Sequence, residues 1–113
     1  MVSITYNEES DNYLMIINGE VDASSSIHLD NALGEAVKSN KNILVDCTDL
    51  KYISSAGLGV FMSYIQEIKE LDIKLVLYGL SDKVKNVFQI LGLDQLLTME
   101  ETLEDAKKRL NAI

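Results

Sequence analysis

Hydrophobic residues recur along the chain at two spacings, one typical of β-strands and one typical of α-helices. In residues 2–8, apolar side chains alternate with polar ones, as in a half-buried strand at the edge of a sheet. Residues 42–47 form a short, continuous apolar run, which is typical of a buried central strand. Residues 55–70 instead repeat their apolar side chains every three or four positions, as an amphipathic helix does.

The same patterns divide the rest of the chain into alternating strands and helices. The predicted strands are residues 2–8, 12–19, 42–47, 73–79 and 96–99, and the predicted helices are residues 24–38, 55–70, 81–92 and 101–113. The order ββαβαβαβα implies parallel strands joined by crossover helices, and the opening hairpin adds an antiparallel edge. We therefore predict one α/β domain over residues 1–113, with a mixed, mostly parallel β-sheet and about four α-helices.

Charge narrows the range of partners. The chain has 18 acidic and 10 basic residues, giving a formal net charge of -8. Nucleic acids and anionic membrane surfaces are bound through Lys and Arg, so we expect neither as a partner and favour a protein instead. The N-terminus has no basic and apolar leader, and no apolar run approaches the roughly 20 residues of a membrane span. These features favour a cytoplasmic domain.

Side chains that hold metals or form disulfides are scarce. Cys47 and His28 are single residues of their kind, so we expect no disulfide, metal site or cofactor. Cys47 is expected to be a small buried hydrophobe, and His28 a surface residue of a helix.

One junction between a predicted strand and a predicted helix carries an unusual combination of residues. Residues 52–61 read "YISSAGLGVF", with two hydroxyl groups followed by two glycines. Ser54 or Ser55 is suited to cap the helix, and a phosphate on a serine there would meet free N–H groups and the positive end of the helix dipole. Gly57 and Gly59 are poor helix formers. Their presence indicates that another backbone or a bulky group packs closely against the helix at these positions.

Other chemistry fits this junction less well. A serine pair before a helix is often only a cap, and the glycines alone could serve packing against a strand. "GLG" is neither a dinucleotide-binding G-x-G-x-x-G motif nor part of a G-x-S-x-G nucleophile elbow. Asp46 and Asp49 could belong to a phospho-accepting receiver domain, but "LVLYGLSDK" has Gly79 and Leu80 where such a site needs a lysine.

Two motifs nevertheless resemble one known family. "DLKYISSAGLGVFMSYIQEIK" resembles the signature of the anti-sigma factor antagonists, the bacterial STAS domains, in which a strand leads to a pattern close to D-S-x-G-L-G and then to a helix. "INGEVDASSS" resembles the second fingerprint of that family, G-E-x-D, at the matching position. The resemblance covers essentially the whole chain, including the order of elements.

The resemblance implies a regulated binding module without catalytic residues, not an enzyme. In that family, the serine before x-G-L-G is phosphorylated by an anti-sigma factor that is itself a serine kinase. That serine is Ser55 here. The unphosphorylated antagonist binds the anti-sigma factor and so releases a sigma factor. Phosphorylation abolishes the binding, and a PP2C-type phosphatase restores it.

The sequence departs from the family pattern on both sides of Ser55. Ser54 stands where the family often has Asp, and Ala56 where it often has Ser or Thr. Ser54 is therefore an alternative phosphoacceptor. Asp22 matches the aspartate of G-E-x-D, although Asp22 or Ser24 could equally cap the helix over 24–38. The residues expected to bind a partner are Asp22, Ser54, Ser55, Ala56, Gly57, Leu58, Gly59 and Val60.

Val60 enters this set because of its helical position. At 100° per residue, one face of the helix holds the apolar residues Leu58, Phe61, Met62, Ile65 and Ile68, while Val60 falls among polar neighbours. An apolar residue on the polar face is a candidate partner contact, although single exposed apolar residues are common.

Two other functions remain open on the sequence. A STAS scaffold or signalling module could bind a different kinase-like switch protein, with no sigma factor involved. A small enzyme or nucleotide-binding domain is the third possibility, but no base lies beside Ser55 and no phosphate-cradling loop is visible.

Overall fold

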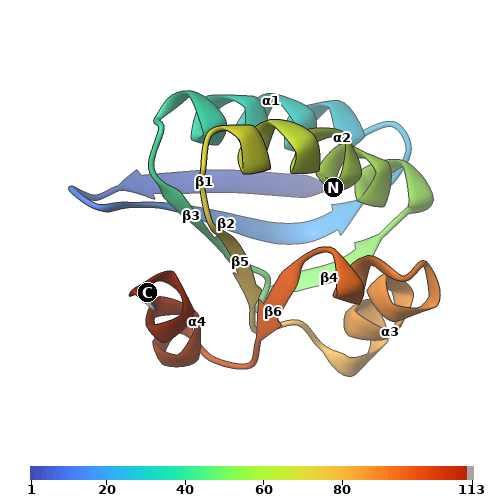
Figure 1. The fold of residues 1–113 in the computed structure, drawn as a ribbon. Coiled ribbons are helices and arrows are strands. Elements are labelled where there is room, and N and C mark those ends of the chain that lie inside the picture. The colour runs from blue at the N-terminus through green and yellow to red at the C-terminus, as the bar shows by residue number, and fades with distance from the viewer. Residues whose placement is uncertain (112–113) are drawn as a thin grey trace.

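The computed structural model describes residues 1–111, which form a layered α/β domain (Figure 1). The strands are β1 (Val2–Glu8), β2 (Asn12–Val21), β3 (Asn42–Asp46), β4 (Leu50–Ile53), β5 (Leu75–Tyr78) and β6 (Thr98–Glu100). The helices are α1 (Ser26–Lys38), α2 (Ser55–Glu70), α3 (Asp82–Ile90) and α4 (Leu103–Asn111), with a short 3-10 helix, η1, at Leu93–Gln95. The helix predicted over 101–113 corresponds to α4, and its last two residues lie outside the described residues.

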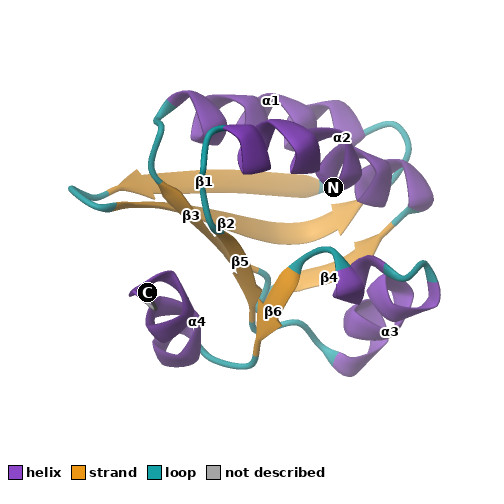
Figure 2. Cartoon of the chain, in the orientation of Figure 1, coloured by secondary structure: helices purple, strands orange, loops and turns teal. Residues whose placement is uncertain are grey.

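All six strands belong to one sheet with a mixed topology (Figure 2). The main path runs β1-β2-β3-β5-β6, with β1 antiparallel to β2 and the other pairs parallel. The long strand β2 also pairs with β4, because its first half borders β3 and its last residues, from Gly19 to Val21, border β4. The predicted fold class, a mixed and mostly parallel sheet with four helices, is confirmed.

Helices cover both faces of the sheet and divide the core in two. α1 and α2 lie together and share the larger core with α3, while α4 packs on the opposite face of the sheet, apart from α3 (Figure 1). The larger core includes Phe61 of α2 and Phe88 of α3, whose ring centroids are 6.0 Å apart. A smaller core lies beneath α4, where Ala106 and Leu110 pack on Leu44, Val76 and Tyr78. No helix among residues 1–111 is both long enough and apolar enough to cross a membrane.

The strand β4 corrects the predicted order of elements. Residues 48–54 are predicted as a connection between a strand and a helix, but Leu50–Ile53 pair with the end of β2. Only Leu50 and Ile53 are buried there, while Lys51 and Tyr52 are exposed. A four-residue strand with two exposed central residues lacks the alternation by which strands are predicted, and its pairing with β2 and the burial of its two end residues stabilise it.

The buried face of α2 also differs from the predicted one. Met62 is predicted to face the core but is 50% exposed, whereas Val60 is half-buried and packs against the core. The reason is that α2 packs on α1 as well as on the sheet. The Tyr64 hydroxyl donates a hydrogen bond to the Asp30 carboxylate of α1 at 2.8 Å, so the buried face is turned toward that helix. Burial and this Asp30 contact raise the pKa of Tyr64 to about 12.

Candidate functional site

The candidate site lies where β2 and β4 end side by side. Val21 and Ile53 are register partners, and the Ser54 N–H donates a hydrogen bond to the Val21 carbonyl at 2.8 Å. The residues that follow these two strands, Asp22 and Ser54, therefore leave the same edge of the sheet as neighbours. The G-E-x-D and S-x-G-L-G motifs, far apart in the sequence, meet here because parallel strands present their carboxyl ends at one edge.

The two serines have different roles in the structure. Ser54 is the N-cap of α2: its backbone is extended, and its hydroxyl oxygen accepts a hydrogen bond from the Gly57 N–H at 3.2 Å. Ser55 is the first helical residue and is exposed. Of the two possible caps in the sequence, the structure uses Ser54. Among the described residues, the Ser55 hydroxyl has no hydrogen-bond partner.

Gly57 is required by the packing of α2 onto the sheet. It is buried, and a Cβ atom at this position would lie 2.7 Å from Ile53 Cγ1 and 2.9 Å from Val21 Cγ1. Leu58 is also buried, with 1% of its surface exposed. The placement of Gly57 and Leu58 on a partner-facing surface is therefore wrong, because both residues lie inside the folded domain.

The exposed part of the predicted partner surface is smaller than the sequence indicates. Ser55, Ala56 and Gly59 are exposed at the start of α2, and a Cβ atom at Gly59 would meet nothing within 4 Å. Asp22 is exposed beside them, and Ser54 and Val60 are half-buried. These six positions form a continuous region around the first two turns of α2, which we call the junction surface.

Asp22 is held by a set of hydrogen bonds before α1. One of its carboxylate oxygens accepts from the Ser24 hydroxyl at 2.8 Å, and from the N–H and the hydroxyl of Ser25 at 2.9 Å each. These hydrogen bonds, from Ser24 first, lower the pKa of Asp22 to about 2. The sequence predicts Asp22 or Ser24 as the N-cap of α1, and this is wrong, because the N-cap is Ser25. Asp22 thus stabilises the preceding turn and keeps a negative charge on the junction surface.

The glycine of the G-E-x-D motif is explained by its backbone. Gly19 has a φ of +96°, in the region that favours glycine, and its α-carbon faces the Met1 carbonyl so closely that no Cβ would fit. The pairing of β2 with β4 shifts register between Gly19 and Glu20. Gly19 therefore makes the irregularity that directs Val21 and Asp22 toward β4, a structural role that sequence reasoning did not assign.

The other candidate chemistry does not form a site. Within residues 1–111, no group of three or more His, Cys, Asp or Glu side chains is placed to hold a metal ion. The Asp46 carboxylate accepts from the Thr48 N–H at 2.9 Å and so stabilises the turn after β3. Cys47 is fully buried, and this burial raises the pKa of its thiol. His28 is exposed on α1, as predicted.

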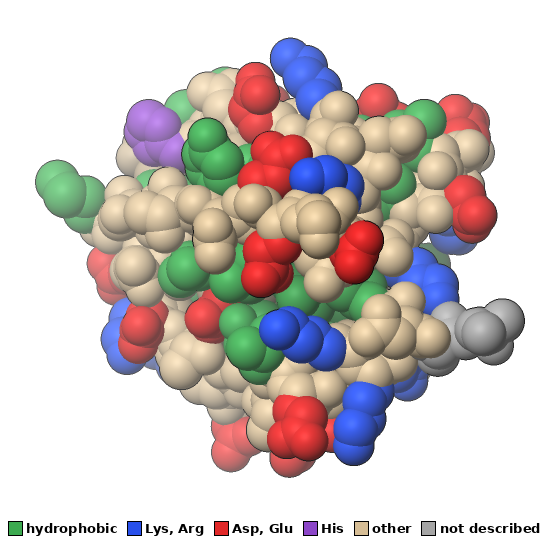
Figure 3. All heavy atoms as spheres, turned by 90° about the vertical axis from the view of Figure 1, so that its left-hand side faces the viewer, with side chains coloured by type: hydrophobic (Ala, Val, Ile, Leu, Met, Phe, Trp, Pro, Cys, Tyr) green, Lys and Arg blue, Asp and Glu red, His purple; other side chains and the backbone are tan. Residues whose placement is uncertain are grey.

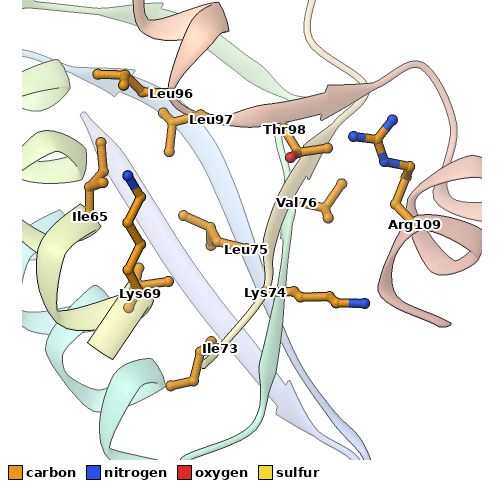
Figure 4. A pocket seen from close by; sticks show the side chains of 11 residues that line it. Ile65, Lys69, Ile73, Lys74, Leu75, Val76, Leu96, Leu97, Thr98 and Arg109 are labelled. Atoms are coloured by element: carbon orange, nitrogen blue, oxygen red, sulfur yellow. The ribbon is translucent and has the colours of Figure 1, made fainter. Parts of the chain in front are cut away.

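A separate groove lies toward the other end of α2. Figure 4 shows this groove of about 330 Å³ between α2, β5, the start of β6 and α4. Ile65, Ile73, Leu75, Leu96 and Leu97 supply much of its apolar lining, and Lys69, Lys74 and Arg109 are its basic residues. Arg109 forms an ion pair with Glu100 at 3.3 Å. None of the junction-surface residues lines this groove.

Charged side chains of both signs are mixed on one face of the molecule. On the face drawn in Figure 3, acidic and basic side chains of the described residues are interspersed, with hydrophobic atoms between them, and no continuous basic patch is present.

The fold and the two meeting motifs define a STAS domain. The family model for the STAS domain matches residues 3–106, so the chain belongs to the STAS domain family. Among known members, the chain is similar to the anti-sigma-B factor antagonist of Listeria monocytogenes, with 32% identity over 88% of this chain and 89% of the relative.

Solved structures agree on the fold. The crystal structure of an anti-sigma factor antagonist from Mycobacterium paratuberculosis has a TM-score of 0.86 at 18% identity, covering 99% of this chain and 96% of that one. The phosphorylated form of the Bacillus cell fate determinant SpoIIAA has a TM-score of 0.70 at 19% identity, covering 96% of this chain and 100% of that chain.

Proposed function

We propose that this protein is an anti-sigma factor antagonist that is switched off by phosphorylation of Ser55. In its unphosphorylated form it binds an anti-sigma factor with serine kinase activity through the junction surface, and so releases a sigma factor. A PP2C-type phosphatase returns it to the binding form. The protein acts as a cytoplasmic binding module and kinase substrate, and has no catalytic activity of its own.

The observation that carries this proposal is the difference between the two serines. The Ser54 hydroxyl is half-buried and occupied as the cap of α2, whereas the Ser55 hydroxyl is exposed on the junction surface. A kinase needs an accessible hydroxyl, so Ser55 is the better acceptor. The similarity to antagonists named for anti-sigma factors supports the class of partner, and the phosphorylated SpoIIAA structure supports the type of switch.

The position of Ser55 explains why the fold would tolerate a phosphate. The phosphate would stand beside the N–H groups that begin α2, at the positive end of the helix dipole, which stabilises an exposed anion by about 0.3–1 kcal/mol. No acidic residue lies in the first turn of α2 to repel it. The Asp22 carboxylate follows the neighbouring strand end, so the phosphate would add charge to a surface that already carries a negative group.

The same phosphate would weaken the bound state strongly. An interface fitted around Gly59 and Ser55 has little room for a phosphate, and removing a dianion from water without a paired cation costs several kcal/mol. A loss of about 3 kcal/mol would lower the affinity more than a hundredfold. The switch would therefore act at the surface and leave the domain folded.

Peptide mass spectrometry after incubation with the cognate kinase and ATP tests the acceptor. Wild type and Ser54→Ala should gain one phosphate on Ser55, while Ser55→Ala should gain none and should stay bound to the anti-sigma factor when ATP is added. Phosphate on Ser54 alone would reject the proposed acceptor.

A second function within the same family is a scaffold or signalling module for another kinase-like switch protein, with no sigma factor involved. The exposed apolar side chain of Met62, two residues beyond the junction surface, suits such a protein partner as well as an anti-sigma factor. Binding assays with purified anti-sigma factor separate the two, because only an antagonist would release bound sigma factor.

A further inference from the structure

The open edge of the sheet at β1 has few of the features that usually protect an edge strand. β1 pairs with β2 over all seven of its residues in an unbroken antiparallel register, and no described segment pairs with its other side (Figure 1). In natural proteins, Pro, Lys, bulges or short length prevent an edge strand from pairing with a strand of another chain. Residues 2–8 contain no Pro, no Lys and no bulge, and their single charge is Glu8 at the end.

The hydrogen bonds at the two ends of the hairpin determine which backbone groups face outward. The Glu9 N–H donates to the Asn12 carbonyl, and the Glu20 N–H donates to the Met1 carbonyl. Hydrogen-bonded pairs alternate with non-bonded pairs along an antiparallel ladder, so the odd-numbered residues of β1 bond to β2. The N–H and C=O groups of the even-numbered residues, from Val2 to Glu8, therefore point to the open edge.

We propose that a second copy of this chain adds to this edge through its own β1, antiparallel and around a two-fold axis at Thr5. This register is the one that pairs all four outward-facing residues of each strand. Val2 of each copy lies opposite Glu8 of the other copy, and Ile4 of each copy lies opposite Tyr6 of the other copy. With two hydrogen bonds in each of the four pairs, about eight new backbone hydrogen bonds form.

The side-chain pairs in this register are favourable on both faces. Tyr6, 65% exposed in the single chain, meets Ile4 of the second copy, an aromatic and β-branched pair that stabilises antiparallel strands. On the other face, Thr5 meets Thr5, and Ser3 meets Asn7, so polar side chains remain together. No like charges lie directly opposite each other. A shift by two residues would place Glu8 opposite Ile4 and would lose one bonded pair.

Charge limits the strength of this association. Each copy carries a net charge of -8, so two copies repel each other at low salt. Salt screens this repulsion, while backbone hydrogen bonds and the Tyr6–Ile4 contact are not lost. We therefore expect a dimer whose dissociation constant falls as salt rises, the opposite of a contact held by attraction between opposite charges.

Sedimentation equilibrium of the purified protein tests the association. The average mass should rise toward that of a dimer with increasing concentration, and more so in 500 mM than in 50 mM NaCl. Tyr6→Lys, which puts a lysine on the edge, should weaken the dimer at least tenfold. Tyr52→Lys, the same change at an exposed tyrosine of β4, should change it less than twofold. A wild-type protein that stays monomeric at all concentrations, or equal effects of the two variants, would overturn the proposal.

Disulfide trapping tests the register. Side chains at 3, 5 and 7 fall in non-bonded pairs of the new ladder, where Cβ atoms approach closely enough for a disulfide. Thr5→Cys should form a covalent dimer under mild oxidation. Ser3→Cys alone should not, because the two cysteines would be about 13 Å apart, but it should crosslink when mixed with Asn7→Cys. The native Cys47 is buried and does not interfere. Crosslinking of Ser3→Cys alone that matches Thr5→Cys would reject the register.

Discussion

The helices α2 and α3 begin in nearly the same way but carry different side chains at their first helical position. Each has an extended serine as N-cap, Ser54 or Ser81, whose hydroxyl accepts from the N–H three residues later at 3.2 Å. After the cap, α3 has Asp82, a permanent negative charge at the positive end of the dipole. α2 has Ser55, which gains such a charge only when it is modified.

The third helical residue differs as well. In α3 this residue is Val84, a buried valine that packs into the core, and in α2 it is Gly57, which lies against Ile53 and Val21. The start of α2 thus packs closely on the ends of β2 and β4, and Ser55 is exposed beside Asp22. The comparison shows that one local capping pattern precedes two different first residues, one with a fixed charge in α3 and one with an exposed hydroxyl in α2.

The largest expected effect is on partner binding by phosphorylated protein. Phosphate on Ser55 should weaken binding to the anti-sigma factor by about 3 kcal/mol, more than a hundredfold, because the interface cannot accept an unpaired dianion. Calorimetry on both forms measures the affinity, and circular dichroism checks the fold. Ser81→Glu, a charge placed at the other cap, is the control and should leave binding unchanged. Equal affinities of the two forms would contradict the switch.

Replacing Gly57 by valine, the residue that α3 has at the same position, should destabilise the domain by about 1–3 kcal/mol through overpacking against Ile53 and Val21. Chemical denaturation measures the loss. Gly59→Ala, two residues further along α2 and in open space, is the matched control and should raise stability by up to about 1 kcal/mol through helix propensity. A Gly57→Val protein as stable as wild type would mean that the helix start can move away from the strands.

Removing either cap should cost a similar free energy of unfolding. Ser54→Ala and Ser81→Ala should each destabilise by about 1 kcal/mol, since each leaves one N–H of the first turn without its acceptor. Only Ser54→Ala should also change phosphorylation kinetics at Ser55, because it loosens the turn that presents that hydroxyl. The comparison fails if Ser81→Ala has the same effect on the kinase reaction.

Exchanging the first helical residues of α2 and α3 should change the free energy of unfolding by smaller amounts and in opposite directions. Ser55→Asp should raise the free energy of unfolding by about 0.3–1 kcal/mol, and Asp82→Ser should lower it by the same amount, as the dipole requires. High salt should reduce both differences. Thermal denaturation at two salt concentrations measures them. Shifts of the same sign would show that the dipole does not dominate at these positions.

The smallest effect concerns Asp22. Its folded-state pKa of about 2 lies below the ordinary value of 3.8, so its contribution to stability is present above pH 4 and is lost as the pH falls toward 2. Asp22→Asn should remove this part of the acid dependence and leave the rest unchanged. Urea denaturation at pH 7 and at pH 3 measures it, with Asp94→Asn as a control. An unchanged acid profile would mean that Ser24 and Ser25 do not hold the carboxylate.

Local sequence patterns were sufficient for most of the fold. The bounds of β1 and α2 agree with the predicted ranges, because each has an undisturbed period and a clear start signal. The two motifs also predicted that Asp22 and Ser55 belong to one site. Strand β4 was missed because its four residues have no periodicity, and it exists through pairing with β2.

By itself, the sequence determined the class of fold, the family and the position of the junction, since all three depend on residue types at short spacings. Only the tertiary structure decided which serine is the cap and which is exposed, because this depends on where Val21 holds the Ser54 backbone. It also decided that Gly57 and Leu58 are internal, and that Met62 rather than Val60 is the more exposed residue on α2. A helix has one periodicity whatever it packs against, and here α1 and the strand ends together select which side is buried.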